Sequence, residues 1–282
     1  MIIATNYRNR EIIKLLVISS LLALLFARPL GDLLALWWHN ADYSHGFFVI
    51  PLSLYMVWQK REAWKDVVDK PSWAGLSIFC LSLIVYLGAL LSRFHTLIFA
   101  AMIVLVLSLC LSFFGWKKSI FFLGPIMFLI FMFPIPSSTY ILITNPLKLL
   151  ITNISATIIN FFGIPVLQQG NLLYFANTSL EVAEACSGIR SIYSYLMLGI
   201  VFSFFCGRML SKAVLVLFPL PLAILVNIIR VTVTGILSHY FGANAAQGFF
   251  HEFTGMALFV VGLIFMLGAY YLVEKRSSKV EK

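Results

Sequence analysis

The sequence predicts an all-α membrane protein that crosses the bilayer about eight times and carries an amphipathic helix and a short β-hairpin on its outer face. Of its 282 residues, 61% are hydrophobic and only 11% are charged, far from the composition of soluble proteins. The apolar residues form runs long enough to cross the ~30 Å of a bilayer core. Because these runs lack the alternation of barrel strands, helices are the structure that satisfies their backbone in lipid.

Eight apolar runs are the predicted membrane spans. The first run has a basic start like a signal peptide, but the following Ala27-Arg28-Pro29 is a poor cleavage site, so we expect an uncleaved helix. We expect one integral membrane domain over residues 1–282, with no C-terminal periplasmic extension. The spans are expected at 12–26, 46–58, 73–91, 96–114, 119–133, 188–206, 213–230 and 254–273.

The distribution of basic residues predicts the orientation of the chain. With the N-terminus in the cytoplasm, most of the 20 Lys and Arg residues fall on the inner side, as the positive-inside rule requires. Both termini are then cytoplasmic. The net charge of +9 lies in short clusters between apolar runs, so we expect no nucleic-acid binding. The basic residues left on the outer side are Arg28, Arg93, Lys148, Arg190 and Arg230.

Residues 134–187 are predicted to lie on the outer face. A helix over 140–162 carries a polar stripe with members three to four residues apart (Thr144, Lys148, Thr152 and Ser155), which favours a position at the interface. If this helix crossed the bilayer instead, Arg208 and Lys212 would move outside and weaken the charge bias. Turn residues and β-formers over 165–183 predict two or three short strands that lead to Cys186.

Cys186 is the candidate nucleophile. The other three cysteines lie inside apolar runs, where a thiol is usually an inert hydrophobe. Cys186 stands at a predicted helix start, where partial positive charge favours the thiolate, and Ser187 and Gly188 offer backbone N–H groups to an oxyanion. The alternative is a buried structural cysteine. A disulfide is not expected, because no other cysteine reaches the outer face.

Arg230 and His251 are the candidate partners of the thiol. Arg230 lies in an apolar run, where a charge costs ~2.5 kcal/mol or more at the helix centre, and Asn227 shares its helix face. The permanent charge of Arg favours oxyanion stabilisation or thiolate pairing. His251 can transfer protons near neutral pH. The alternatives are an arginine that reaches the headgroups and a histidine of the interfacial aromatic belt.

Four further side chains are weaker candidates for support or substrate binding. Arg190 follows Cys186 by one helical turn, Glu252 adjoins His251, and Tyr43 and His45 lie at the mouth of the second predicted span. No H-x-x-x-H or C-x-x-C spacing occurs, so we expect no metal, and nothing in the sequence points to a cofactor. A transporter and a non-catalytic scaffold of polysaccharide or protein export remain alternatives, although the polar residues crowd one face and no repeat is found.

Three short motifs, in this order, resemble those of the exosortases: Ala185-Cys186-Ser187-Gly188-Ile189, Asn227-Ile228-Ile229-Arg230-Val231 and His251-Glu252-Phe253-Thr254-Gly255. The early Tyr43-Ser44-His45-Gly46 resembles the same family. The resemblance implies a cysteine transpeptidase of the bacterial inner membrane, with its active site on the periplasmic face. Its partners would be exported proteins whose C-terminal sorting signal has a Pro-Glu-Pro-like motif, a transmembrane helix and a basic tail, together with membrane lipid and a glycan or lipid acceptor.

The resemblance also implies a role for each candidate residue. Cys186 matches the nucleophile that forms an acyl-thioester, Arg230 matches the essential arginine described as a proton donor, and His251 matches a residue thought to stabilise the transition state. The chemistry of the side chains favours the opposite division of the last two roles, with proton transfer by His251 and charge stabilisation by Arg230. No energy cofactor is needed, because one peptide bond is exchanged for a thioester and then for a new bond.

Overall fold

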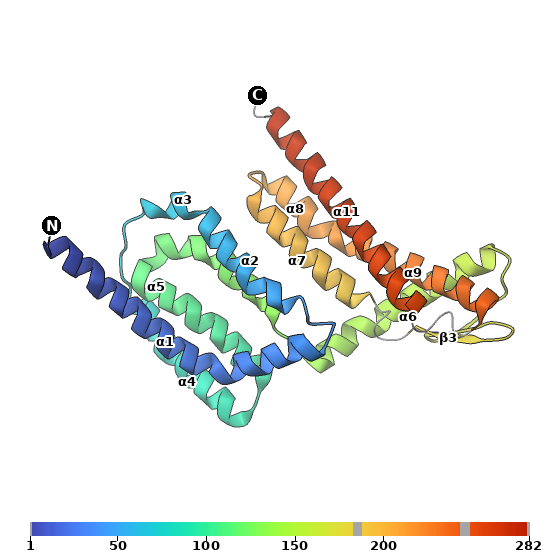
Figure 1. Ribbon diagram of the computed structural model, residues 1–282, viewed down its shortest axis with the longest axis horizontal. Coiled ribbons are helices and arrows are strands. Elements are labelled where there is room, and N and C mark those ends of the chain that lie inside the picture. Colours follow the sequence, from blue (N-terminus) through green and yellow to red (C-terminus); the bar gives the residue numbers. More distant parts are fainter. Residues whose placement is uncertain (1, 183–187, 243–248, 281–282) are drawn as a thin grey trace. The chain divides into compact units, whose positions relative to one another are not determined.

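The computed structural model describes the backbone of residues 2–182, 188–242 and 249–280, without the side chains of 2–16, 19, 249–253 and 276–280. The chain forms two compact units, residues 1–134 and 135–282 (Figure 1). Unit 1 contains α1 (Ile2–His39), α2 (Gly46–Gln59), α3 (Arg61–Lys65), α4 (Trp73–Ser92), α5 (His95–Phe128) and the 3-10 helix η1 (Leu129–Met132).

Helix α1 is longer than the first predicted span. It continues through Pro29 to His39, where the sequence predicted an end near Phe26. The Tyr86 hydroxyl of α4 donates a hydrogen bond to the Leu25 carbonyl oxygen at 2.7 Å, and its ring packs edge-on against Phe26 at 5.6 Å. The end of the predicted span thus contacts α4, and the helix extends beyond it.

Helix α5 consists of two helical segments that meet at Gly115. Gly115 has φ 73° and ψ 178°, and a methyl group there would overlap the Lys70 carbonyl oxygen, so only glycine fits. The Lys70 N–H donates to the Phe114 carbonyl at 3.3 Å. Phe99 stacks on Phe133 with ring centroids 4.5 Å apart, which shows that the chain returns alongside itself after Gly115. The fourth and fifth predicted spans are thus present as two antiparallel helices.

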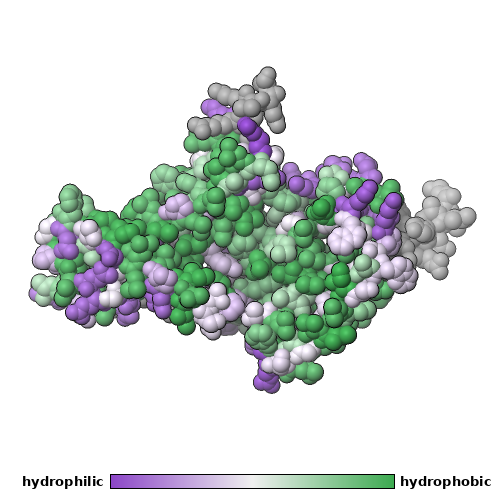
Figure 2. Space-filling view, turned by 180° about the vertical axis from the view of Figure 1, so that it is seen from behind, coloured by the Kyte–Doolittle hydropathy of each residue, from purple (hydrophilic) through white to green (hydrophobic). Residues whose placement is uncertain are grey.

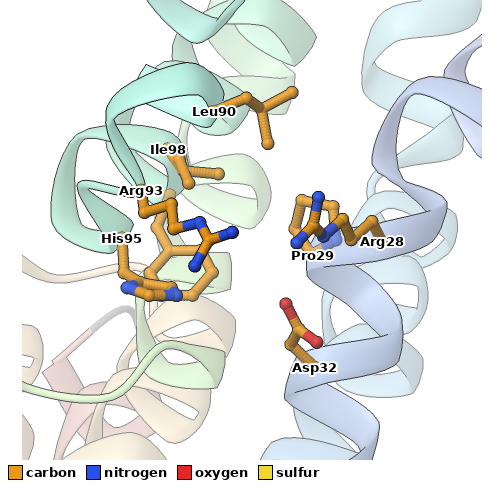
Figure 3. A pocket seen from close by; sticks show the side chains of 8 residues that line it. Arg28, Pro29, Asp32, Leu90, Arg93, His95 and Ile98 are labelled. Atoms are coloured by element: carbon orange, nitrogen blue, oxygen red, sulfur yellow. The ribbon is translucent and has the colours of Figure 1, made fainter.

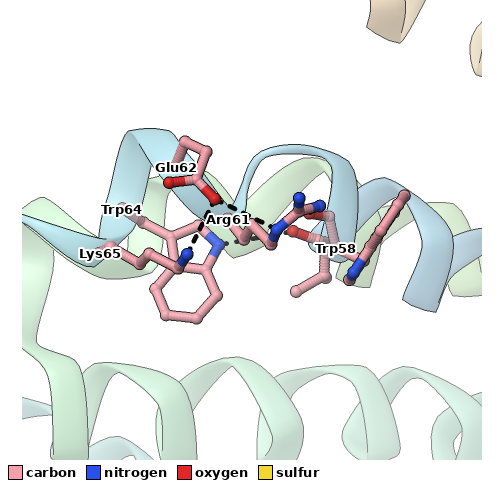
Figure 4. Close-up of polar contacts among 6 residues, drawn as sticks. Trp58, Arg61, Glu62, Trp64 and Lys65 are labelled. Atoms are coloured by element: carbon pink, nitrogen blue, oxygen red, sulfur yellow. Dashed lines mark hydrogen bonds and ion pairs between the residues drawn. The ribbon is translucent and has the colours of Figure 1, made fainter.

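Helix α3 lies on the predicted cytoplasmic side and is held by surface ion pairs (Figure 4). The Glu62 carboxylate accepts from Arg61 Nε at 3.2 Å and from Lys65 Nζ at 2.8 Å. The hydrogen bond from Lys65 lowers the pKa of Glu62. The Arg61 guanidinium also lies 4.2 Å from the centre of the Trp58 ring. A charged group beside a Trp at a helix end is typical of a membrane boundary.

The described residues of unit 2 form four long helices, one short helix and a small sheet. The predicted strands are confirmed and form a three-stranded antiparallel sheet in the order β1-β2-β3, one strand more than a hairpin. The elements are α6 (Ser137–Phe161), β1 (Leu167–Gln169), β2 (Leu172–Tyr174), β3 (Ser179–Glu181), α7 (Ile189–Phe205), α8 (Met209–Leu217), α9 (Pro219–Phe241) and α11 (Phe249–Val280).

Two hydrophobic cores lie one after the other along α9. The first half of α9, including Val226, packs with Tyr195 of α7 and Met266 of α11. The Tyr195 hydroxyl donates to the Phe259 carbonyl of α11 at 2.9 Å and ties these two helices together. The second half of α9, from Ile228 onward, packs with α6 and the sheet. The buried hydrophobic residues of α9 change from one core to the other at Asn227, between Val226 and Ile228, while the partly buried Ile224 packs on the second core.

The structure corrects the predicted end of the seventh span. Helix α9 continues to Phe241, so Arg230 lies inside the helix and does not close it. The predicted span ended at the charged Arg230, but the helix continues because its second half is buried against protein. Gly235, for example, faces Ile159 of α6 and Phe175, and a methyl group there would lie 2.7 Å from Ile159 Cδ1.

The polar stripe of α6 faces protein. Thr144, Thr152 and Ser155 are fully buried, and the Ser155 hydroxyl donates to the Ile228 carbonyl of α9 at 3.3 Å. The exposed residues include Leu142 and Leu150. The three uncharged members of the stripe therefore do not require headgroup water, whereas Lys148 is only half-buried. The interfacial position stays a prediction, since α6 is also long and apolar enough to span.

Six helices among the described residues are long and apolar enough to cross a membrane. Helices α2 and α7 are shorter apolar helices at two further predicted spans. Hydrophobic residues cover much of the face shown in Figure 2, as expected of a multi-pass membrane protein. The number eight stays a prediction. The six segments are Ser20–His39, Trp73–Ser92, His95–Met132, Ser137–Phe161, Met209–Phe241 and Thr254–Lys275.

Candidate active site

The predicted site residues of α9 lie where the two cores of unit 2 meet. Asn227 is only 2% exposed and Arg230 is half-buried. They are three residues apart, so both side chains leave the same face of the helix. A buried amide and a guanidinium on one helix face can hold an anion, because both present N–H donors.

The start of α7 contacts Asn227. Gly188 has φ 78°, in the left-handed region, and a methyl group there would lie 3.1 Å from Asn227 Nδ2 and 3.2 Å from its Cγ. The chain therefore passes Asn227 as closely as glycine allows. Cys186 and Ser187 immediately precede this point and lie outside the described residues. The described backbone thus brings the Cys186 motif to within two residues of Asn227.

The third motif reaches the same helix face from α11. A methyl group on Gly255 would lie 2.9 Å from Arg230 Nη2 and 3.0 Å from its Cζ, so the guanidinium rests on the Gly255 backbone. His251 precedes Gly255 by one helical turn in α11. The side chains of His251 and Glu252 lie outside the described set. The elements that carry all three motifs therefore converge on one turn of α9.

Arg190 and the two candidates of unit 1 are placed separately. Arg190 is exposed in the first turn of α7. His45 Nε2 lies 3.1 Å from the Phe131 carbonyl oxygen of η1, and its ring centre lies 6.4 Å from that of Tyr43. Burial lowers the pKa of His45, which favours the neutral imidazole. The described contacts of His45 and Tyr43 are thus within unit 1, and their part in the site stays a prediction.

The lowered pKa of His45 predicts that unit 1 loses stability in mild acid. With the folded pKa below the usual 6.5, the unfolded chain binds the proton first. The neutral His45 therefore contributes to the free energy of unfolding in full above pH 6.5, and this contribution is lost as the pH falls through the folded pKa. We expect the melting temperature of the wild type to drop between neutral pH and about pH 5, and His45→Gln, which cannot titrate, to drop less. Equal pH dependence in both proteins would contradict this prediction.

Within the described ranges, no three His, Cys, Asp or Glu side chains gather closely enough to hold a metal ion. This does not include Cys186, His251 and Glu252, whose side chains lie outside the described set. The absence of a metal from the predicted mechanism therefore stays an expectation from the spacing of the motifs.

Sequence reasoning missed the role of Gly255. It appeared only as the last letter of the His251 motif, whereas the structure makes it the surface on which Arg230 lies. A small residue on a helix that faces a charged side chain is the signal that could have identified it. Sequence reasoning included Gly188, but for its backbone N–H group and for substrate access, not for its contact with Asn227.

Gly255→Ala is expected to disturb the site, and the same change at Gly268 is not. The new methyl at 255 would displace the Arg230 guanidinium, whereas nothing lies within 4 Å of the methyl at 268 on the same helix. Ala also raises helix propensity by about 1 kcal/mol at both positions. We expect Gly268→Ala to keep or raise the melting temperature, and Gly255→Ala to lower any activity that depends on Arg230. Identical behaviour of the two variants would refute the contact.

The comparisons with known proteins identify one family. The family model described as transmembrane exosortase matches residues 37–268. The match begins in the last turn of α1, ends within α11 and includes all three motifs. No curated protein and no solved structure matches the chain.

Proposed function

This chain belongs to the transmembrane exosortase family, and we propose that it is a cysteine transpeptidase that removes the C-terminal sorting signal of exported proteins. The observation that carries the proposal is the convergence on α9. Gly188, two residues after Cys186, lies against Asn227, and Gly255, one helical turn after His251, lies against Arg230. In this proposal, three motifs far apart in the sequence bring a thiol, a permanent cation and an imidazole to one place.

In the proposed mechanism the Cys186 thiolate attacks the carbonyl carbon of the scissile peptide. A C–S bond forms and the carbonyl oxygen becomes an oxyanion. The backbone N–H groups of Ser187 and Gly188 and the Arg230 guanidinium stabilise that charge. Collapse of the intermediate breaks the C–N bond, and the leaving amine takes a proton from His251. An acceptor nucleophile, or water, then gives its proton to the neutral His251, attacks the thioester and releases the thiolate, which restores the starting state.

We assign proton transfer to His251 because an arginine side chain stays protonated at any physiological pH. The pKa of an unperturbed histidine, near 6.5, lies close to the working pH, which makes proton transfer efficient. Asn227 supports the site by donating from its buried amide beside Gly188. Arg190, one turn after Cys186, favours the thiolate through its charge, and Glu252 is proposed to bind substrate or support the site.

The proposed site lies at the periplasmic face of the bacterial inner membrane, with both termini cytoplasmic. The charge distribution supports this orientation. The hydrophobic helix of the substrate would enter from the lipid, and its Pro-Glu-Pro-like motif would reach Arg230. Tyr43 and His45 are proposed to bind substrate.

The proposal is tested by trapping the thioester. The full-length protein is co-expressed with a reporter that ends in a sorting signal of this type, and cells are quenched in acid. We expect a covalent enzyme–reporter adduct that hydroxylamine cleaves and that peptide mapping assigns to Cys186. Cys80→Ala, a change at an exposed cysteine of α4, should leave the adduct unchanged. Reporter cleavage without an adduct, or an adduct at another residue, would overturn the proposal.

A further inference from the structure

A cavity of about 220 Å³ lies in unit 1 between α1 and the turn that joins α4 to α5 (Figure 3). Its charged lining comes from both sides: Arg28 and Asp32 from α1, and Arg93 from the turn, with His95 beside it. Figure 3 shows the guanidinium groups of Arg28 and Arg93 and the Asp32 carboxylate projecting toward the space between the two walls. The remaining lining is apolar and consists of Pro29, Leu90, Ile98 and Phe99.

The cavity lies beside the end of α4, a helix long and apolar enough to cross a membrane. Helix α4 has twenty residues, or ~30 Å, which is the thickness of the hydrocarbon core, and it ends at Ser92, directly before Arg93. The hydrogen bond from Tyr86 to Leu25 fixes the level of α1 against α4. Arg93 follows Tyr86 by as many residues as Asp32 follows Leu25, so these charges lie at one depth. If α4 spans the hydrocarbon core, these charges lie at the level of the lipid phosphates.

The cavity has a net charge of +1, because the guanidinium groups of Arg28 and Arg93 outnumber the Asp32 carboxylate by one. Within the described part of the chain, no hydrogen bond or ion pair joins the side chains of Arg28, Asp32 or Arg93 to a protein group. Two guanidinium forks from opposite walls match the geometry of a phosphate group, which accepts bidentate hydrogen bonds. Leu90, Ile98 and Phe99 provide an apolar base on which a lipid tail can lie.

We propose that this cavity binds the phosphate group of a membrane lipid, through Arg28 and Arg93. Two sources share this chemistry: a glycerophospholipid of the bilayer, and a polyprenyl monophosphate of the kind that carries glycans. Asp32 opposes the binding of a phosphate that lacks a neighbouring amine, because its carboxylate adds a like charge to the cavity. The inference concerns unit 1 alone and does not depend on the proposed transpeptidase chemistry.

The test is lipid retention by the purified full-length protein, measured by native mass spectrometry. The probes are phosphatidylglycerol, phosphatidylethanolamine, a polyprenyl monophosphate and diacylglycerol, which lacks phosphate. Arg28→Gln and Arg93→Gln should each weaken retention of at least one phosphate lipid about tenfold, the effect of losing a hydrogen bond to a charged group. The lipid that responds identifies the source. Arg61→Gln, which removes a charge from α3 in the same unit, should change nothing.

Asp32→Asn is expected to change lipid retention in the opposite direction to the two arginine variants. Removing the carboxylate should strengthen retention of phosphatidylglycerol and of the polyprenyl monophosphate, whereas a merely damaged fold would weaken every probe. Melting temperatures of the variants distinguish these two effects. The proposal is overturned if both arginine variants retain phosphate lipids like the wild type, if diacylglycerol is retained equally well, or if Asp32→Asn weakens all the probes.

Discussion

Cys186→Ala is expected to leave the sorting tail uncleaved on every substrate molecule while the protein accumulates normally in the membrane. Removing the nucleophile of a covalent mechanism lowers the rate on the order of 10⁶-fold, so no cleaved product should be detectable in cells. The measurement is the ratio of tailed to processed reporter, separated by size. Cys186→Ser should also be inactive in this assay, because a hydroxyl is a much weaker nucleophile than a thiolate.

The control for this experiment is a cysteine in a different environment. Cys80 is exposed in α4, within an apolar run, and Cys80→Ala should process the reporter like the wild type. Normal processing by Cys186→Ala would remove the nucleophile from the mechanism and favour a scaffold. Loss of processing in both variants would show instead that the assay reports on folding, which the amount of each protein in the membrane would reveal.

The helices of this protein could be predicted from sequence because each apolar run is both long and bounded. Gly115 marks one such boundary, since its backbone conformation separates the two segments of α5. The sheet could also be predicted, because Gly170 and Asn171 mark the turn between two short runs of β-formers, and Gly170 takes φ 62° there. Local conformation and hydropathy decide these features, and both can be read from neighbouring residues.

The ends of α1 and α9 could not be predicted, because tertiary contacts extend both helices. Arg230 looked like the last residue of a span, yet the polar residues that follow it, such as Ser238, are buried against protein. Lipid is then not their solvent, and hydropathy does not decide where the helix ends. The same reason explains α6, whose polar stripe includes Thr152 and packs inside the unit.

The candidate site could be predicted in its residue types and not in its contacts. The cost of a charge in an apolar run identified Arg230, and the helix start identified Cys186. The close approaches of Gly188 to Asn227 and of Gly255 to Arg230 join residues far apart in the chain. Only the packing of α7 and α11 against α9 reveals them, because no periodicity in one segment reports its distance from another.

Arg230→Gln is expected to lower the rate of processing by about 10² to 10³-fold, the usual effect of losing one oxyanion donor. The glutamine amide still has N–H donors, but it lacks the positive charge and the planar guanidinium that lies on Gly255. The measurement is the processing rate of the reporter after a pulse of synthesis. Arg190→Gln, a change at the exposed arginine of α7, should cost much less, since its proposed contribution is electrostatic and exposed to solvent. Equal losses in both variants would contradict a specific role of Arg230.

Arg230→Lys separates the two possible roles of Arg230 and His251. Lysine keeps the positive charge, but its pKa near 10.4 lies well below that of arginine. If Arg230 were the proton donor, the lysine variant would lose activity as the pH rises toward that pKa. If His251 donates the proton, the lysine variant should keep the pH dependence of the wild type, with a change near 6.5, at a lower rate. We expect the second result, because a guanidinium that stabilises an oxyanion has no need to release its proton.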